Sequence, residues 1–227
     1  MTKNYTRKYA KDFNILTRLY QLYALYILFF PLSRLFYKVK VEGFENVPKG
    51  HPHIYAANHI SYLDPFMVAL GCRVKIAFIA KIELFQNSKY IAKNIWRLGA
   101  FGVNREKPDI STIKSVKEVA KANWSLCIFP QGGIRKNKKL EHITKGFTMM
   151  AKMMKYDIVP IAITGCETYN WKIFRRQQIN IKVGKPISWE LPDEEIIKQW
   201  KDVVSNMSGY ENVPDEVTQE EIAAAKI

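Results

Sequence analysis

Hydrophobic residues in this 227-residue chain fall into short continuous runs and into longer stretches with helical spacing. The short runs are rich in Val, Ile, Phe and Tyr, and most are bounded by Gly, Pro or Asn, as is typical of strands. We expect strands over 38–42, 53–57, 74–80, 125–129, 158–164 and 178–183. The longer stretches predict helices over 62–70, 82–98, 110–123, 143–156 and 194–207. Their alternation predicts an α/β fold, a single layered domain whose mostly buried mixed sheet is flanked by helices.

Prolines and an aspartate refine this prediction. Pro192 and Asp193 supply a start signal for the last helix, and Asp109 suits the N-cap of the helix that begins at residue 110. Pro160 has no backbone N–H, so its place in the run 158–164 favours an edge strand or the start of a strand. In α/β folds the ligand crevice lies beyond the strand ends, so the residues that follow the strands are the first candidates for function.

An apolar segment precedes the predicted domain. Residues 19–32, LYQLYALYILFFPL, contain Gln21 as their only clearly polar side chain and lie between Arg18 and Arg34. A transmembrane helix needs about 20 apolar residues, so this run of 14 favours a helix in the membrane interface over one that spans it. The tyrosines in the run suit the headgroup zone, and no cleavage site of a secretory signal follows. A buried core helix is the remaining alternative.

Charge is distributed unevenly along the chain. The net charge is +14, but the residues from Glu190 onward carry ten acidic and three basic side chains, so residues 1–189 carry +21. A strongly basic body predicts an anionic partner such as nucleic acid, anionic lipid or a phosphorylated substrate. The apolar N-terminal run, together with the lack of a recognition motif, disfavours nucleic acid and favours an anionic membrane surface.

These patterns divide the chain into three parts. We expect N-terminal membrane-associating helices over 1–36, an α/β domain over 37–208 and an acidic tail over 209–227 that ends in a short helix at 220–226. Apolar residues make up 48% of the sequence, enough for most of the chain to fold around a core. The three cysteines are odd in number and widely spaced, which argues against a disulfide framework or a zinc site. They predict small buried side chains in a reducing compartment.

Candidate chemistry begins directly after the strand predicted at 53–57. His59 and Asp64 stand five residues apart, which would put them on different faces of a regular helix. They can meet only across a bend from strand to helix, where the Asp64 carboxylate would accept a hydrogen bond from one ring nitrogen. The other nitrogen would then act as a general base on a hydroxyl, whereas Ser61 lacks the Gly-x-Ser-x-Gly turn of a nucleophile. Taken alone, the spacing more often marks a capping histidine and an aspartate at a helix start.

Two further segments bring glycines and arginines together. Residues 99–105, GAFGVNR, contain two glycines and Arg105, whose planar guanidinium suits a phosphate. Residues 128–135, IFPQGGIR, lead from a strand into a Gly-Gly turn and then to Arg135, where free backbone amides beside the guanidinium would form an anion site. Individually, each arginine is more often an ordinary surface charge.

In their order and spacing, these segments resemble the glycerolipid acyltransferase family typified by bacterial 1-acylglycerol-3-phosphate acyltransferases. The family pattern is Asn-His-x4-Asp, then Gly-x3-Val-x-Arg, then Phe-Pro-Glu-Gly-x2-Arg, then a Val-Pro strand. The matching positions here are Asn58, His59, Asp64, Gly99, Val103, Arg105, Phe129, Pro130, Gly132, Arg135, Val159 and Pro160. The resemblance covers roughly residues 35–190, and the combination is far more specific than any one block.

The resemblance implies a reaction and a role for each residue. His59, oriented by Asp64, would deprotonate the acceptor hydroxyl, which attacks the thioester of acyl-CoA or acyl-carrier protein directly. Arg105 and Arg135 would bind the phosphate of a lysophospholipid acceptor, with Gly132 allowing close approach. The expected substrate-binding set is completed by Asn58, Ser61 and Gln131. No acyl-enzyme, cofactor or metal is implied, and the enzyme would be a peripheral or monotopic protein on the cytoplasmic face of the cell membrane.

Gln131 departs from the family pattern, which has Glu, and Gly133 stands where Thr is common. Gln keeps the shape of Glu without its charge, and both changes fall in the predicted acceptor site. Three hypotheses stay open. The acceptor is 1-acylglycerol 3-phosphate, which gives phosphatidic acid, or it is another lysolipid or an acylated amino lipid. Alternatively, the chain is a non-catalytic lipid-binding protein of the same fold, which the intact Asn-His-x4-Asp block disfavours.

Overall fold

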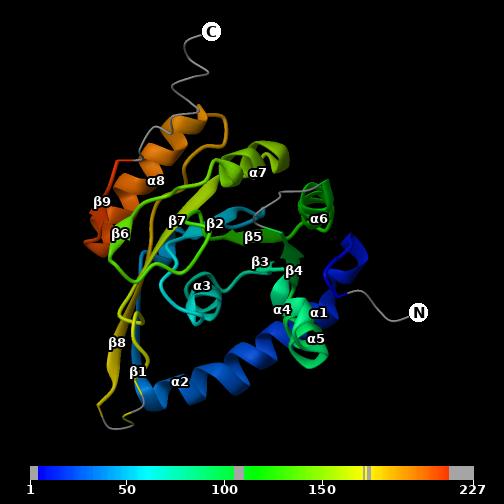
Figure 1. The fold of residues 1–227 in the computed structure, drawn as a ribbon, viewed down its shortest axis with the longest axis horizontal. Coiled ribbons are helices and arrows are strands. Elements are labelled where there is room, and N and C mark those ends of the chain that lie inside the picture. The colour runs from blue at the N-terminus through cyan, green and yellow to red at the C-terminus, as the bar shows by residue number, and fades with distance from the viewer. Residues whose placement is uncertain (1–4, 105–109, 171, 173–174, 215–227) are drawn as a thin grey trace.

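A seven-stranded mixed sheet forms the centre of the protein, seen in a computed structural model that describes residues 5–104, 110–170, 172 and 175–214 (Figure 1). The strands are β1 (Tyr37–Glu42), β2 (Ile54–Ala57), β3 (Ile76–Lys81), β4 (Ala100–Val103), β5 (Ser125–Ile128), β7 (Ile158–Thr164) and β8 (Gln177–Val183). Their order across the sheet is β1-β8-β7-β2-β5-β3-β4. From β7 to β4 all neighbours are parallel, whereas β8 is antiparallel to β7 and parallel to β1. The predicted α/β fold with a mixed sheet is confirmed.

Helices cover both faces of the sheet. They are α3 (Asp64–Cys72), α4 (Glu83–Gln86), α5 (Lys89–Arg97), α6 (Ile110–Lys121), α7 (Gly146–Met154) and α8 (Asp193–Ser208), with short 3-10 turns at Ala10–Asp12 and Phe44–Asn46. On one face the helices α6, α7 and α8 pack side by side, and α3 lies on the other face (Figure 1). Every residue of β2, β4 and β5 is buried, as expected for parallel strands that are covered on both sides.

Two predicted elements differ from the structure. Residues 100–103, for which the sequence predicted no strand, form the edge strand β4. A Cβ added at Gly102 would lie 3.1 Å from the ring of Phe85, so glycine here lets α4 pack closely on the strand. The single helix predicted over 82–98 is interrupted and forms α4 and α5, because Ser88 caps α5 by accepting a hydrogen bond from the Ile91 N–H.

Pro160 lies inside β7, between β8 and β2, so the prediction of an edge strand or a strand start is wrong. Its carbonyl accepts a hydrogen bond from the Gly184 N–H (2.8 Å), just past the last β8 residue, Val183. The N and C=O of one residue in an extended strand point to the same side. The missing N–H of Pro160 therefore faces the end of β8, and the pairing with Ala56 of β2 is kept.

A single helix runs from Ile15 to Phe36. It consists of α1 (Ile15–Leu22), the π-helical segment η2 (Tyr23–Phe29) and α2 (Phe30–Phe36). The N–H of Phe30 donates to the carbonyl of Leu25, five residues earlier, which is the π-helical spacing. Pro31 follows directly, and a proline ring would clash with the carbonyl four residues before it in an α-helix. The wider π turn accommodates this ring without ending the helix.

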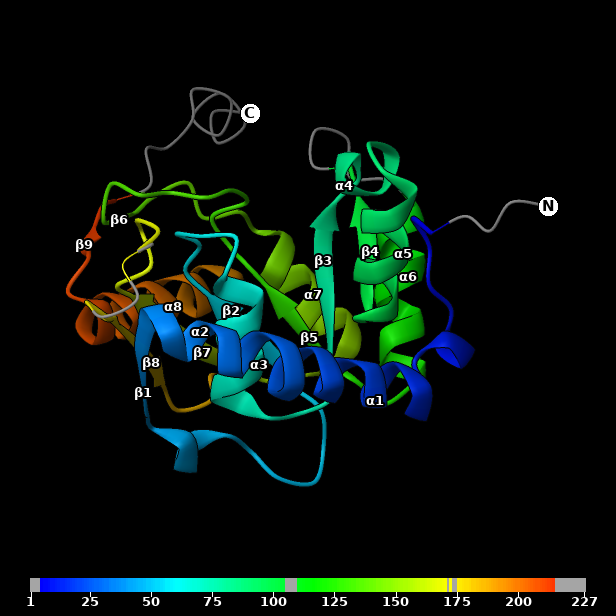
Figure 2. The ribbon, with the colours of Figure 1, turned by 90° about the horizontal axis from the view of Figure 1, so that it is seen from below.

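This helix is long and apolar enough to cross a membrane, judged by length and composition alone. Only 17% of its most apolar 18-residue window is buried, so the alternative of a buried core helix is wrong. Its outer side exposes Ile15, Leu16, Leu19, Tyr23, Tyr26, Ile27, Leu28, Leu32 and Leu35. Figure 2 shows the helix lying across the domain, in front of α3 in this view from below.

Two polar side chains fix the helix to the domain. The Nε2 of Gln21, which is buried, donates to the carbonyls of Ile76 (2.6 Å) and Leu98 (2.8 Å). The Arg18 guanidinium donates to the carbonyl of Val74 (2.7 Å), just beyond the end of α3. These bonds satisfy main-chain carbonyls on two segments of the domain, so the helix is an integral part of the fold.

The described part of the predicted acidic tail also belongs to the domain. Tyr210 is buried, and its hydroxyl donates a hydrogen bond to Glu167. The next residues form β9 (Glu211–Asn212), which pairs with β6 (Lys139–Leu140) in a small second sheet. The fold therefore continues beyond the boundary predicted at residue 209, because an apolar ring anchors the chain there. The helix predicted over 220–226 lies outside the described residues.

Candidate active site

The bend from β2 into α3 brings His59 and Asp64 together, as the sequence predicted. Nδ1 of His59 lies 2.7 Å from Oδ2 of Asp64, and the same oxygen accepts the N–H groups of Ile60 (2.7 Å) and Ser61 (2.8 Å). Asp64 is fully buried, so these donors compensate a negative charge that burial would otherwise penalise. With Asp64 ionised, Nδ1 is the donor, which leaves Nε2 of the imidazole as the basic nitrogen.

The second oxygen of Asp64 faces Cys166, a contact that the sequence analysis missed. The Cys166 thiol donates to Oδ1 across 3.4 Å, and burial together with the Asp64 charge holds the pKa of this thiol above its ordinary value. It is therefore a neutral donor. Cys166 lies just beyond β7, the parallel neighbour of β2, so a search of all strand ends on this edge of the sheet would have found it.

His59 is also held by the segment that follows β5. Its ring stacks on Phe129, with centroids 4.1 Å apart and planes 19° from parallel. The main-chain N–H of His59 donates to Oε1 of Gln131 (3.2 Å), and the main-chain carbonyl of His59 accepts the main-chain N–H of Arg135 (2.7 Å). The strands β5 and β7 thus flank β2 and contribute the contacts that fix the His59–Asp64 pair.

Asn58 links the site to β7 through both ends of its amide. Its Oδ1 accepts the N–H of Ile163 (2.7 Å), and its Nδ2 donates to the carbonyl of the same residue (2.9 Å). The side chain is fully buried and extends the parallel β2–β7 ladder past Ala57 in the way a strand residue would. The structure therefore shows Asn58 as a brace between strands, and its predicted contact with substrate stays a prediction.

The other predicted binding residues lie in different settings. Ser61 is buried, and its hydroxyl oxygen accepts the Leu63 N–H (3.2 Å). Gly132 has a φ of +66°, and an added Cβ would meet nothing closer than 3.8 Å, so its backbone conformation explains the glycine. Arg135 is exposed. Arg105 lies outside the described residues.

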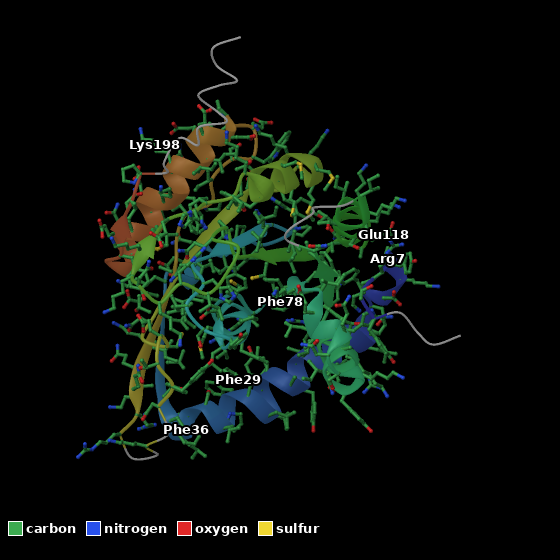
Figure 3. All side chains as sticks on the ribbon, in the orientation of Figure 1. Arg7, Phe29, Phe36, Phe78, Glu118 and Lys198 are labelled. Carbon is green, nitrogen blue, oxygen red and sulfur yellow. The ribbon has the colours of Figure 1, made fainter. Side chains whose placement is uncertain are left out.

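An apolar cavity of about 420 Å³ opens beside His59. It follows β3 from Lys81 at the carboxyl end to Ile76 at the amino end, and α3, α4 and α5 contribute to its walls. The N-terminal helix supplies another wall through Arg18, Gln21, Ala24 and Leu25. Nearby, Phe29 of the helix stacks on Phe66 of α3 with centroids 4.5 Å apart; Figure 3 labels Phe29 and the cavity-lining Phe78 of β3. Local sequence patterns did not reveal that the helix shapes this cavity.

Basic side chains follow the segment that contacts His59. Arg135, Lys136 and Lys138 follow the Gly-Gly turn and are exposed, with Nζ of Lys136 5.6 Å from the ring centroid of Tyr169. Within the described ranges, no three His, Cys, Asp or Glu side chains gather closely enough to hold a metal ion. The arrangement is suited to an anion next to the buried His59.

Comparison with known proteins assigns the chain to a family. The sequence profile of the family described as Acyltransferase matches residues 38–164, more than half of the chain. The protein belongs to this acyltransferase family. The matched region begins in β1 and ends at the last residue of β7, so it contains the His59–Asp64 pair and the segment 129–135.

Relatives of this acyltransferase include curated 1-acyl-sn-glycerol-3-phosphate acyltransferases. That of Bacillus subtilis (strain 168) is 30% identical over 150 residues, which are 66% of this chain and 73% of the relative. That of Streptococcus pneumoniae is 34% identical over 137 residues, 60% of this chain but only 50% of the relative. The structure of the 1-acyl-sn-glycerophosphate acyltransferase from Thermotoga maritima shares the fold, with a TM-score of 0.63 at 22% identity, over 87% of this chain and 95% of that one.

We expect Asn58→Ala to lower the free energy of unfolding by about 2–4 kcal/mol, since each buried polar group that loses its partner costs about 1–3 kcal/mol. Chemical denaturation followed by tryptophan fluorescence measures the change. Asn46→Ala is the matched control, because its Nδ2 makes one half-buried bond to the Val183 carbonyl (2.8 Å), and its cost should be smaller. An Asn58→Ala protein as stable as the wild type would contradict the bracing role.

Proposed function

We propose that this acyltransferase moves a fatty acyl group from a thioester donor to the hydroxyl of 1-acylglycerol 3-phosphate and so forms phosphatidic acid. The observation that carries the proposal is His59, held by a buried carboxylate on one nitrogen and lining an apolar cavity. The names of the curated relatives support the choice of acceptor. The donor is acyl-CoA or acyl-carrier protein, both of which present the required thioester.

His59 acts as the general base in this mechanism. Its Nε2 takes the proton of the acceptor hydroxyl while the hydroxyl oxygen attacks the thioester carbonyl. Asp64 accepts the Nδ1–H bond throughout, and so stabilises the imidazolium that forms. When the tetrahedral intermediate collapses, the C–S bond breaks and the imidazolium returns the proton to the leaving thiolate. The acyl group passes directly to the acceptor, and the histidine is regenerated neutral.

The cavity beside His59 takes an acyl chain in this proposal. Its walls are mainly aliphatic and aromatic side chains from β3, α3 and the N-terminal helix. Moving hydrocarbon from water into such a space is favourable by about 0.8 kcal/mol per methylene group. The cavity begins at the base, so a chain that occupies it would present its polar end to His59.

Arg135 binds the phosphate of the acceptor in this proposal. The residue is exposed. Its main-chain N–H donates a hydrogen bond to the His59 carbonyl (2.7 Å), which keeps Arg135 close to the proposed base. A planar guanidinium can donate two parallel hydrogen bonds to a phosphate. Arg105 is the second predicted phosphate ligand.

A different acceptor, such as another lysolipid or an acylated amino lipid, is the second candidate. Gln131 and Gly133 motivated it, since the family pattern has Glu at the first position and often Thr at the second. Gln131 is buried, however, and both ends of its amide contact main chain, at His59 and Lys139. The change from Glu to Gln is therefore taken up by contacts with the main chain, which removes this reason for a different acceptor.

The N-terminal helix places the enzyme on a membrane surface in this proposal. Its outer side exposes leucine, isoleucine and tyrosine side chains, and its inner side lines the cavity. Together with the net positive charge, this supports a peripheral or monotopic protein on an anionic, cytoplasmic leaflet.

We expect His59→Ala to lower kcat by about 10²–10⁴-fold, the range typical of a lost general base. The assay follows a labelled acyl-CoA into phosphatidic acid, and sedimentation with lipid vesicles should be unchanged. The exposed His142 provides the control, since His142→Ala should keep full activity. Wild-type turnover in His59→Ala would exclude the general-base role.

We expect Arg135→Ala to raise KM for 1-acylglycerol 3-phosphate by about 10-fold or more, since a hydrogen bond to a charged group contributes about 1.5–3 kcal/mol. KM for the acyl donor should stay the same. Lys198→Ala, on α8 and labelled in Figure 3, removes an exposed charge elsewhere and should leave both values unchanged. An unaltered KM for the acceptor would mean that another group binds the phosphate.

We expect the double change Leu28→Asp and Leu32→Asp to weaken binding to anionic vesicles at least about 10-fold. The reason is that each leucine that inserts into the membrane contributes roughly 1.5–3 kcal/mol to binding. Both side chains are more than half exposed, so the fold should tolerate the charges. Met149→Asp changes a similarly exposed apolar residue on α7 and is the control. Undiminished vesicle binding would show that another surface carries the affinity.

A further inference from the structure

Gln131 lies beneath the catalytic histidine, in the segment that follows β5. Its Oε1 accepts the N–H of His59 (3.2 Å), and its Nε2 donates to the carbonyl of Lys139 (2.9 Å). The residue is 3% exposed, so its side chain is almost closed to a ligand. Its amide thus connects the loop that carries His59 with β6, one partner at each end.

The rest of the segment supports the same contact. The Gly132 N–H donates to the Phe129 carbonyl (3.0 Å) and closes a tight turn around Pro130 and Gln131. Gly132, the last residue of this turn, has a positive φ, which favours glycine. After this turn the Arg135 N–H reaches the His59 carbonyl (2.7 Å). The main chain of His59 is therefore held on both sides, while Phe129 packs against its ring.

We propose that Gln131 is a positioning residue that sets the place of His59 through its main chain, and that in this chain, which departs here from the Glu of the family pattern, the contacts of Gln131 require a neutral amide. The inference rests on the proposed role of His59 as general base. Only a group that both accepts and donates can satisfy the His59 N–H and the Lys139 carbonyl together. A carboxylate would accept from His59 but would face the Lys139 carbonyl oxygen with no hydrogen, a repulsive contact between two acceptors.

The substitution Gln131→Glu converts this requirement into a pH dependence. A protonated carboxyl can donate to the Lys139 carbonyl, so the variant should work best where the new carboxyl is neutral. Burial raises the pKa of that carboxyl, and the Asp64 charge acts in the same direction. The basic side chains at 135, 136, 138 and 139 oppose this, but they lie at or near the surface, and Lys139 pairs with Glu211 (3.3 Å), so burial dominates.

We expect kcat of Gln131→Glu to fall about 10–100-fold relative to wild type at alkaline pH, since small displacements of a catalytic group have effects of this size. The ratio of variant to wild-type kcat should rise as the pH is lowered and the carboxyl takes up its proton. KM for the acceptor should not change. Gln131→Met, which fills the same space with no amide, should show a lowered kcat at every pH.

Asn46→Asp is the matched control. It makes the same amide-to-acid change against a main-chain carbonyl, that of Val183, on a segment away from the site. Its stability should fall, but its kcat relative to wild type should stay flat with pH. Should Gln131→Glu fail to fold, Gln131→Met decides the question through its kcat and KM.

Two results would overturn the proposal. A raised KM for the acceptor with unchanged kcat would mean that Gln131 contacts the substrate, and a kcat ratio independent of pH would mean that the charge does not matter. The ¹⁵N signals of the His59 ring give a readout without turnover: in Gln131→Glu they should show an additional titration step that wild type lacks. If wild type transfers nothing to 1-acylglycerol 3-phosphate, the proposed function fails, and these signals still decide the role of Gln131.

Discussion

The buried carboxylate of Asp64 is the constraint on which the rest of the site depends. A charge without solvent must be surrounded by donors, and one oxygen of Asp64 receives three of them, from His59, Ile60 and Ser61. The chain between β2 and α3 has to curl around this oxygen to deliver them. The same curl sets the imidazole with Nδ1 inward, and this orientation makes the other nitrogen available to a substrate. The structural requirement and the proposed chemistry are thus satisfied by one geometry.

Support for that geometry comes from the strands on either side of β2. Asn58 is tied to β7, Cys166 lies at the end of β7, and the segment after β5 holds the ring and the main chain of His59. Because β5, β2 and β7 are parallel neighbours, their carboxyl ends converge on one edge. Side chains far apart in sequence therefore hold His59 in place before any substrate arrives. Such preorganisation removes the need to order the site during the reaction.

The N-terminal helix has two sides with different tasks. The inner side donates hydrogen bonds from Gln21 and Arg18 to main-chain carbonyls and forms a wall of the cavity beside His59. The outer side exposes large apolar residues. A helix fixed in this way to the domain relates the orientation of any bound membrane to that of the cavity. Because one polar residue in an otherwise apolar run supplies two of the anchoring bonds, Gln21 is explained by the fold.

The sequence by itself determined the α/β class, most of the strands and helices, and the segments in which the chemistry lies. These follow from local periodicity and from sequence blocks such as Asn58–Asp64, whose residue types and spacing can be read without knowing how the chain packs. The short strand β4 was missed because four residues with a glycine carry too little periodic signal. Only the tertiary structure decided the cavity, the interior place of Pro160 and the burial of Gln131. The physical reason is that a hydrogen bond such as that between His59 and Gln131, 72 residues apart, depends on the order of strands in the sheet.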